Sequence, residues 1–304
     1  MNLKIMAISA LILAVTACSN DKAEEKAQAE KNANEESQVN EVTTEAQPKL
    51  QQSALELAID GVHRTLEHKV RDKYRHPKET LEFFAVKPGM KVVEIWPGGS
   101  GWYTEILAPL VGKEGKLYAA QFDPNHEVDF YGKARTKFTE KMNANPEVYA
   151  NVQITTFQPP KHLEIAPENS VDYVLTFRNV HNWMMNNGGR DNALIAFKAM
   201  YKALKPGGYL GVVEHSLASG LEQEEFAQSG YMNEKYTIDL AKEAGFVLVG
   251  KSDVNRNYKD TTQHLKGVWT LPPRLALGDE DKEKYLEIGE SNRMTLRFVK
   301  PAAQ

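Results

Sequence analysis

The stretch "VVEIWPGGSGWYTEIL", residues 92 to 107, decides the fold class of this chain. It starts with an apolar run typical of a buried strand, passes through a glycine cluster, and continues with a helical pattern. A nucleotide-binding turn needs glycines so that the backbone can approach a ligand, and a following helix whose free N–H groups face it. Taken alone, the cluster fits a tight strand-to-helix connection without a ligand equally well.

From Ser53 onward, short apolar runs alternate with amphipathic stretches, which is typical of an α/β sheet with crossover helices. The simplest interpretation is one domain over residues 53 to 304. Two helices separated near Pro77 are expected before the first strand, and the long loop that carries Trp269 is expected to be ordered. The predicted strands cover residues 91 to 96, 116 to 122, 151 to 157, 171 to 177, 209 to 215, 246 to 252 and 294 to 299.

The N-terminus predicts export. Residues 1 to 18 combine Lys4, an apolar stretch too short for a stable membrane span, and "VTAC", which resembles the lipobox of bacterial lipoproteins. We expect a signal peptide that ends with a lipidated Cys18, and Ser19 after it favours the outer membrane, with the domain facing the periplasm. An ordinary signal peptide with a chance cysteine remains the alternative. Residues 19 to 52 lack aromatic side chains and predict a disordered or partly helical linker.

Composition excludes several classes of protein. The 304 residues carry a formal charge of -4 and a sequence pI near 6.1, so no basic field attracts nucleic acid. The single cysteine rules out an intrachain disulfide. No metal site is predicted, because the histidines show no i, i+4 pairing. The composition favours a small-molecule partner and says nothing about oligomeric state.

Four segments, in this order and spacing, resemble the Rossmann-like methyltransferases that depend on S-adenosylmethionine. They are "VKPGMKVVEIW", "GKLYAAQFDPN", "SVDYVLTFRNVHNW" and "ALKPGGYLGVVEH", and "YRHPKETLEFF" with "WTLPPRLALGD" further resembles predicted exported bacterial methyltransferases. The resemblance implies a seven-stranded, mostly parallel sheet with an antiparallel last strand and S-adenosylmethionine as cofactor. The cofactor-binding residues that it implies are Glu94, Trp96, Gly98, Gly99, Ser100, Gly101, Gln121, Asp123, Phe157 and Asn179.

The chain departs from the family at several of these positions. The family's glycines fall on Trp96, Gly98 and Ser100, so only the middle one is kept. Where the family places an acidic residue for the ribose hydroxyls the chain has Gln121, whose carbonyl accepts less than a carboxylate does. Phe157 suits either stacking on adenine or packing in the core. A nicotinamide dinucleotide site fits worse, because the third glycine of its fingerprint falls on Thr104.

Candidate catalytic residues follow the fourth and fifth strands. Ligands of open α/β sheets lie beyond the carboxyl ends of the strands, where His181, Glu214 and His215 should meet. Methyl transfer needs a base only if the acceptor carries a proton, and His181 is the first candidate. The aromatic residues expected to converge at the same edge are Trp96, Trp102, Tyr103 and Trp183.

Two functions therefore remain open at the level of sequence. The first is an exported methyltransferase acting on a small or envelope-derived acceptor. The second is a noncatalytic, lipid-anchored binding module that kept the fold and lost the cofactor.

Overall fold

The computed structural model describes residues 52–185 and 188–302. The predicted signal peptide and the predicted linker up to residue 51 lie outside the described residues. In the part of the chain that is described, no helix combines the length and the apolar character needed to cross a membrane.

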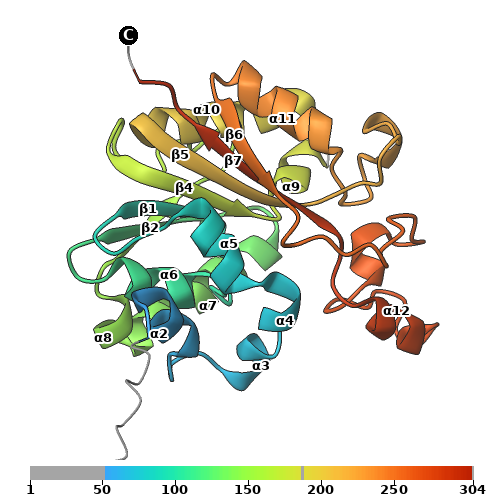
Figure 1. Cartoon of the computed structure of the whole chain (residues 1–304), viewed down its shortest axis with the longest axis horizontal. Helices are drawn as coiled ribbons and strands as arrows, with labels where there is room; N and C mark the ends of the chain where they lie inside the picture. Colours follow the sequence, from blue (N-terminus) through green and yellow to red (C-terminus); the bar gives the residue numbers. More distant parts are fainter. Residues whose placement is uncertain (1–51, 186–187, 303–304) are drawn as a thin grey trace, which may run out of the picture. The chain divides into compact units, whose positions relative to one another are not determined.

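A seven-stranded sheet forms the centre of the domain (Figure 1). Its strand order is β3-β2-β1-β4-β5-β7-β6, and β7 runs antiparallel to both of its neighbours while the other pairs are parallel. The predicted seven strands, mostly parallel with an antiparallel last strand, are confirmed. The strands are β1 (Lys91–Ile95), β2 (Lys116–Gln121), β3 (Val152–Thr156), β4 (Val171–Phe177), β5 (Leu204–His215), β6 (Val247–Ser252) and β7 (Arg293–Val299).

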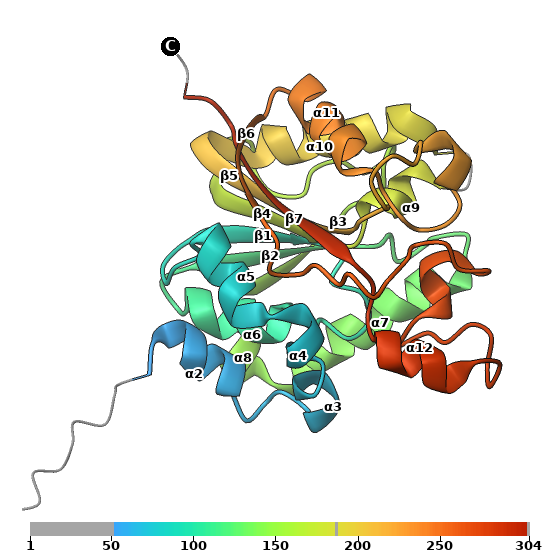
Figure 2. The same ribbon diagram turned by 45° about the vertical axis from the view of Figure 1, so that its right-hand side comes forward.

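Helices cover both faces of the sheet, which explains why β1 and β4 are nearly continuous apolar runs (Figures 1 and 2). One face carries α9, α10 and α11, and its core includes Trp183 and Phe197. The other carries α2, α5, α6 and α7, with Phe84 and Phe138 in its core. The helices are α2 (Ala54–Asp60), α3 (Leu66–Lys69), α4 (Asp72–Arg75), α5 (Pro77–Phe84), α6 (Thr104–Val111), α7 (Asp129–Ala144), α8 (Pro146–Tyr149), α9 (Val180–Met184), α10 (Gly189–Ala203), α11 (Glu234–Glu243) and α12 (Lys282–Ile288), with short 3-10 helices at Glu224–Phe226 and Gly267–Thr270.

The region before β1 differs from the expectation of two helices. Residues 52 to 90 contain four short ones, and the last two are separated by a sharp turn at His76, whose φ of 40° is left-handed, directly before Pro77 starts α5. The boundary near Pro77 is thus where the sequence placed it. The long segment between β6 and β7 is ordered, as expected, and contains the 3-10 helix with Trp269 as well as α12.

The order of the strands determines where a ligand can bind. The sheet grows in one direction from β1 through β2 to β3, and in the other from β4 to β5, so the topology switches between β1 and β4. Crossover connections leave the sheet on opposite sides at such a point, and this opens a crevice beyond the carboxyl ends of the two strands. The first residues after those ends are Trp96 and Arg178.

Candidate functional site

Both residues at the switch point have an unusual backbone conformation. Trp96 has a φ of 44° and Arg178 a φ of 64°, in the left-handed region that side chains larger than glycine's rarely adopt. Such conformations cost of order 1–3 kcal/mol each and cluster at functional sites. Two of them side by side, at the edge where the topology predicts a ligand, make this edge the candidate site.

Trp96 is held in place by its indole ring. Its Nε1 donates to the carbonyl oxygen of Phe157 at 2.7 Å, and its ring centroid lies 4.9 Å from that of Phe122 and 5.7 Å from that of Trp183. The first residue of this turn must be left-handed, which explains why the related family usually has glycine there. In this chain, aromatic packing and one hydrogen bond offset the backbone cost.

An aromatic-walled cavity of about 760 Å³ opens next to Trp96, and Trp183 and Tyr131 also line it. Loops that follow β1, β2, β3 and β4 all contribute to it, so it occupies the predicted crevice. Its full lining is Trp96, His126, Val128, Tyr131, Gln158, Pro159, Pro160, Asn182, Trp183, Met185, Gly188, Asp191, Asn192 and Ile195.

Three residues that line this cavity carry a buried polar atom without a hydrogen-bond partner among the described residues. They are the donor Nε1 of Trp183 and the acceptors Oε1 of Gln158 and Oδ1 of Asn192. Leaving such groups unpaired costs about 1–3 kcal/mol each, so three of them around one cavity make it the candidate binding site. One donor and two acceptors complement the edge of adenine, which offers ring-nitrogen acceptors and an exocyclic amine.

The glycines of the turn have different roles. A side chain at Gly98 would meet nothing within 4 Å, so the backbone there is open to a ligand. A Cβ at Gly101 would lie 2.8 Å from the ring of Phe138 on α7, and one at Gly99 would contact Ala134 on the same helix. Glycine is therefore required at Gly101, where a side chain would clash with α7, whereas a side chain at Gly99 would make only ordinary contact at 3.4 Å. That all three glycines face the cofactor stays a prediction.

Several other predicted cofactor residues are engaged within the protein. The fully buried amide of Gln121 donates to the carbonyl oxygen of Gly98 at 2.8 Å and accepts from the N–H of Phe122, so it braces the turn. The Asn179 amide donates to the carbonyl oxygen of Ile95 at 2.8 Å and joins the ends of β1 and β4. Neither amide faces the cavity, because the turn uses both for its own hydrogen bonds.

Glu94 and Phe157 are also interior residues. The carboxylate of Glu94 accepts a hydrogen bond from the hydroxyl of Thr104 at 2.6 Å. Burial raises the pKa of Glu94 to about 8, although that hydrogen bond acts in the opposite direction. Phe157 is fully buried against Trp96 and Trp183, so it packs in the core and does not stack on a ligand.

The last two predicted cofactor residues lie nearer the surface. Ser100 is exposed, and its carbonyl oxygen accepts from the ammonium group of Lys141 at 2.6 Å. The carboxylate of Asp123 accepts from the N–H of Asn125 and lies 3.3 Å from the ring nitrogen of His162. Neither lines the aromatic-walled cavity.

The three predicted catalytic residues meet, as the strand order implied. Nδ1 of His181 lies 2.9 Å from Oε1 of Glu214, and the ring centroids of His181 and His215 are 5.2 Å apart. Because an ionised carboxylate only accepts, Nδ1 carries the proton and Nε2 of a neutral His181 keeps its lone pair. No hydrogen bond to Nε2 occurs within residues 52–185 and 188–302, so this nitrogen is available to a substrate.

His215 has a less suitable environment for a base. Its Nδ1 lies 2.6 Å from the hydroxyl oxygen of Ser291. Burial lowers the pKa of His215 well below its usual value, and the neighbouring His181 and Arg178 act in the same direction. A lowered pKa makes the imidazole a weaker proton acceptor, which favours His181.

The same three residues also resemble a set of metal ligands. One ligand atom from each lies within 4.8 Å of the others, an arrangement that the sequence spacing did not predict. Both oxygens of Glu214 are already occupied, however. Oε1 accepts from the N–H of His215 at 2.7 Å as well as from His181, and Oε2 accepts from the N–H of Val180 at 2.5 Å. The carboxylate therefore caps α9 and orients His181, and the set fits a proton-transfer pair better than a metal centre.

The expected aromatic convergence is confirmed only in part. Trp96 and Trp183 meet in the cavity, but Trp102 and Tyr103 belong to the core on the opposite face of the sheet. Trp102 lies beneath the guanidinium groups of Arg64 and Arg75, at 5.0 and 4.6 Å from its ring centroid. The sheet itself separates the two pairs, which no spacing in the sequence reveals.

Sequence reasoning missed Arg178, Gln158 and Asn192. Arg178 stands inside the quoted "TFRNVHNW", directly after the fourth strand, so the rule that singled out His181 applied to it equally. Gln158 and Asn192 carry no such signal, because their importance lies in the absence of a hydrogen-bond partner in the folded state.

Comparison with known proteins agrees with this architecture. The chain is 28% identical over 163 residues to the demethylmenaquinone methyltransferase of Listeria monocytogenes serotype 4a, an alignment that covers 52% of this chain and 58% of that protein. It is 34% identical over 141 residues to the ubiquinone/menaquinone biosynthesis C-methyltransferase of Shewanella frigidimarina, covering 46% and 48%. The chain thus spans about half the length of these relatives. No protein-family model matches it.

Solved structures resemble the described domain in fold. A methyltransferase from Aquifex aeolicus described as SAM dependent superposes with a TM-score of 0.50 at 18% identity, covering 76% of this chain and 92% of that one. The phosphoethanolamine N-methyltransferase 2 of Haemonchus contortus, in complex with S-adenosyl-L-methionine, superposes with a TM-score of 0.50 at 17% identity, covering 84% and 61%. The fold of the domain is the Rossmann-like methyltransferase fold.

Proposed function

We propose that this protein is an S-adenosylmethionine-dependent methyltransferase that acts on a small acceptor. The observation that carries the proposal is the aromatic-walled cavity at the switch point, with its unpaired donor and two unpaired acceptors, next to the His181–Glu214 pair. Cofactor sites are typically preformed, mostly apolar cavities with a few polar groups that set the orientation. The methyltransferase relatives support the same activity.

The residues of the cavity fit the cofactor. Adenine would lie against the aromatic wall formed by Trp96, Trp183 and Tyr131, beside the amides of Gln158 and Asn192. The open backbone at Gly98 would receive the methionine part. S-adenosylmethionine supplies a sulfonium methyl group, whose positive charge suits an aromatic surface. The protein's own contribution is to position the acceptor and exclude water. His181, oriented by Glu214, would take the proton that a hydroxyl or amine acceptor loses.

Export and lipid anchoring belong to the same proposal. The lipobox-like "VTAC" and the polar segment after it support a domain tethered by a lipidated Cys18 on the periplasmic side of the outer membrane. The acceptor would then be a small or envelope-derived molecule.

One observation favours the second candidate, a binding module that has lost the cofactor. The amide of Gln121 is already hydrogen-bonded to Gly98 and Phe122. The end of β2 therefore offers no free side chain to bind the ribose hydroxyls. A domain without that contact could retain the fold for another purpose.

Binding of S-adenosylmethionine to the full chain in detergent separates the two candidates. Titration calorimetry should show one site, and tryptophan fluorescence should change because Trp96 and Trp183 line the cavity. Trp183→Phe keeps an aromatic side chain but removes the unpaired N–H, so it should weaken binding by about tenfold. Because the smaller ring also leaves a void in the core and lowers the melting temperature, binding is measured at a temperature where the variant is fully folded. Trp269→Phe provides the matched control outside the cavity. If wild type does not bind, the noncatalytic reading replaces the proposal.

A further inference from the structure

Four arginines gather near the candidate site around one carboxylate. Arg71 and Arg75 come from the N-terminal helices, Arg178 follows β4, and Arg293 starts β7. Glu290 supplies the carboxylate. Burial alone would raise the pKa of Glu290, but the four arginines lower it to about 2. The four side chains come from three segments that are distant in sequence, so the cluster exists only in the folded protein.

Glu290 is occupied by three of the arginines. It lies 2.6 Å from Nη2 of Arg71 and 2.6 Å from Nη2 of Arg293, with Nε of Arg75 farther away at 3.4 Å. Among the described residues it is the only carboxylate within ion-pair distance of any of the four. One negative charge thus faces four positive ones in a largely buried setting, where unpaired charge is costly.

Among the described residues, three of the guanidinium groups keep free donors, and Arg71 is the one of these that already pairs closely with Glu290. Arg293 is fully engaged, because it also donates to the carbonyl oxygen of Tyr74 and the hydroxyl of Ser291. Within residues 52–185 and 188–302, the guanidinium of Arg178 makes no hydrogen bond, and the two terminal nitrogens of Arg75 make none either. An anion with several oxygens is the ligand that such planar donors prefer.

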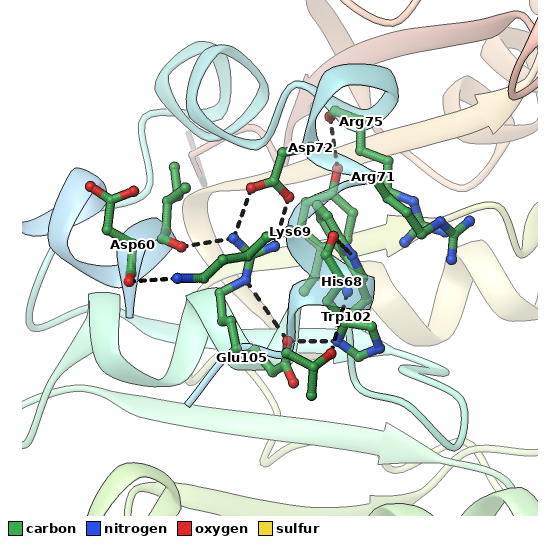
Figure 3. A network of polar contacts seen from close by, with 12 residues as sticks. Asp60, His68, Lys69, Arg71, Asp72, Arg75, Trp102 and Glu105 are labelled. Atoms are coloured by element: carbon green, nitrogen blue, oxygen red, sulfur yellow. Dashed lines mark hydrogen bonds and ion pairs between the residues drawn. The ribbon is translucent and has the colours of Figure 1, made fainter. Parts of the chain in front are cut away.

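The N-terminal helices hold this cluster firmly against the sheet. The buried carboxylate of Glu105 on α6 lies 2.7 Å from Nδ1 of His68 and 3.8 Å from Nε of Arg64, while Asp72 pairs with Arg64 at 2.7 Å (Figure 3). Figure 3 shows Arg71 and Arg75 leaving the same short helical stretch that this network fixes. The segment that carries Arg71 and Arg75 is therefore fixed within the protein and does not depend on a ligand for its position.

The cluster adjoins the proposed proton acceptor. Arg293 is the cross-strand neighbour of His215, and both side chains contact the hydroxyl of Ser291. The N–H of Arg178 donates to the carbonyl oxygen of Val213 at 2.7 Å, directly before Glu214. Burial lowers the pKa of Arg178 to about 10, and Arg293 acts in the same direction. Burial also lowers the pKa of Arg75, and the positive charge of Arg178 lowers it further. Both arginines help to lower the pKa of His215. The positive charge thus extends from the arginines to the ring that neighbours His181.

We propose that Arg75 and Arg178 bind an anionic group, a carboxylate or a phosphate, carried by the methyl acceptor. This assignment to the acceptor rests on the proposed methyl transfer. The acceptor is then a small anionic molecule whose charged end is held by the arginines while the atom to be methylated faces His181. The other source of the same chemistry is the carboxylate of S-adenosylmethionine itself, and the experiment separates the two.

Inorganic phosphate is the probe for the site, with the full chain in detergent and sodium chloride at equal ionic strength as the salt control. Phosphate should raise the melting temperature of wild type saturably. Arg178→Gln should raise the phosphate concentration that gives half of the maximal stabilisation by at least about tenfold, because the planar guanidinium donors of Arg178 are lost. Arg190→Gln, at an exposed arginine paired with Glu243, should respond like wild type. Without phosphate, Arg178→Gln should be at least as stable as wild type, since one of four like charges is gone.

Three results would overturn the proposal. Wild type could lack a saturable response to phosphate, or Arg178→Gln could keep the wild-type response. If Arg178→Gln does not fold, Arg178→Lys takes its place. An undiminished response of Arg178→Lys to phosphate counts equally against anion binding by the guanidinium of Arg178. The third result is competition between the two ligands. If the dissociation constant for S-adenosylmethionine rises with the phosphate concentration, the arginines bind the carboxylate of S-adenosylmethionine and not the acceptor.

The same measurements keep the inference and the proposed function apart. If phosphate does not stabilise the chain but S-adenosylmethionine binds, only the anion site fails. If S-adenosylmethionine does not bind at all, the methyltransferase proposal fails and the acceptor assignment fails with it. Phosphate binding together with unchanged affinity for S-adenosylmethionine supports both.

Discussion

At the scale of single residues, the arrangement of His181 separates a chemical from a structural role. Glu214 accepts the Nδ1 proton, so the amide of an asparagine at position 181 can keep that hydrogen bond while Nε2 disappears. Truncation to alanine would instead leave a buried carboxylate oxygen without its donor, and a slower enzyme could then simply be a less stable one.

We expect His181→Asn to slow methyl transfer by about 10² to 10⁴, with melting temperature and S-adenosylmethionine affinity close to wild type. Steady-state rates with an identified acceptor, together with calorimetry, check this. His215→Asn is the matched control, because it removes the equivalent nitrogen of the neighbouring ring and keeps a donor toward Ser291. Wild-type turnover in His181→Asn would return His181 to a structural role.

Glu94 gives the chain a specific pH dependence. Its pKa is raised from 4.5 in the unfolded chain to about 8 by burial, so the folded state holds a proton that the unfolded state releases within this window. This contribution to the free energy of unfolding is complete below pH 4.5 and is lost as the pH rises through 8. It amounts to at most roughly 5 kcal/mol.

Glu94→Gln, which is neutral at every pH, should therefore gain stability relative to wild type as the pH rises from 5 to about 8. Urea denaturation across that range measures the difference. Glu67→Gln, at an exposed position, is the control and should follow wild type. A constant difference between wild type and Glu94→Gln would contradict a buried, protonated carboxyl group.

At the scale of elements, the turn after β1 combines strain with packing. Trp96 occupies a left-handed position that glycine adopts freely, and Gly101 is required where the turn touches α7. The turn can pack directly against α7 because Gly101 has no side chain to clash with Phe138. The turn therefore keeps its direction although only one of the family's glycines remains.

This strain predicts an inverted order of two substitutions. Trp96→Gly should be about 1 kcal/mol more stable than Trp96→Ala, because alanine must bear the left-handed φ of 44°. At Trp183, inside α9, the order should be normal, with glycine about 1 kcal/mol less stable than alanine. Urea denaturation of the four variants makes the comparison. If alanine were the better replacement at both positions, the turn would carry no strain at Trp96.

At the scale of the whole molecule, the proposed anchor can be tested without any assay of activity. Cys18 lies outside the described residues, and its acylation rests on "VTAC" after an apolar stretch. Wild type should incorporate labelled fatty acid and Cys18→Ser should not, as judged by gel fluorography of expressing cells. Equal labelling of the two proteins would exclude acylation at Cys18. Stable attachment would need more than one acyl chain, because a single chain binds membranes only marginally.

The sequence by itself determined the class of fold and most element positions. Apolar runs and turn residues are local signals, so β1 and β4 lie where the pattern predicted them, within one residue. The conclusion that His181, Glu214 and His215 meet also followed from local signals, because parallel strands bring their carboxyl ends to one edge. The short helices before β1 were less predictable, since no proline marks the breaks that separate α2, α3 and α4.

Only the tertiary structure decided which side chains remain available to a ligand. Gln121 and Asn179 had the right positions in the chain, but the folded turn uses their amides for its own hydrogen bonds. Conversely, the unpaired atoms of Gln158 and Asn192 and the arginine cluster arise from segments far apart in sequence. Hydrogen-bond satisfaction and charge balance are properties of the whole set of neighbours, and those neighbours exist only once the chain has folded.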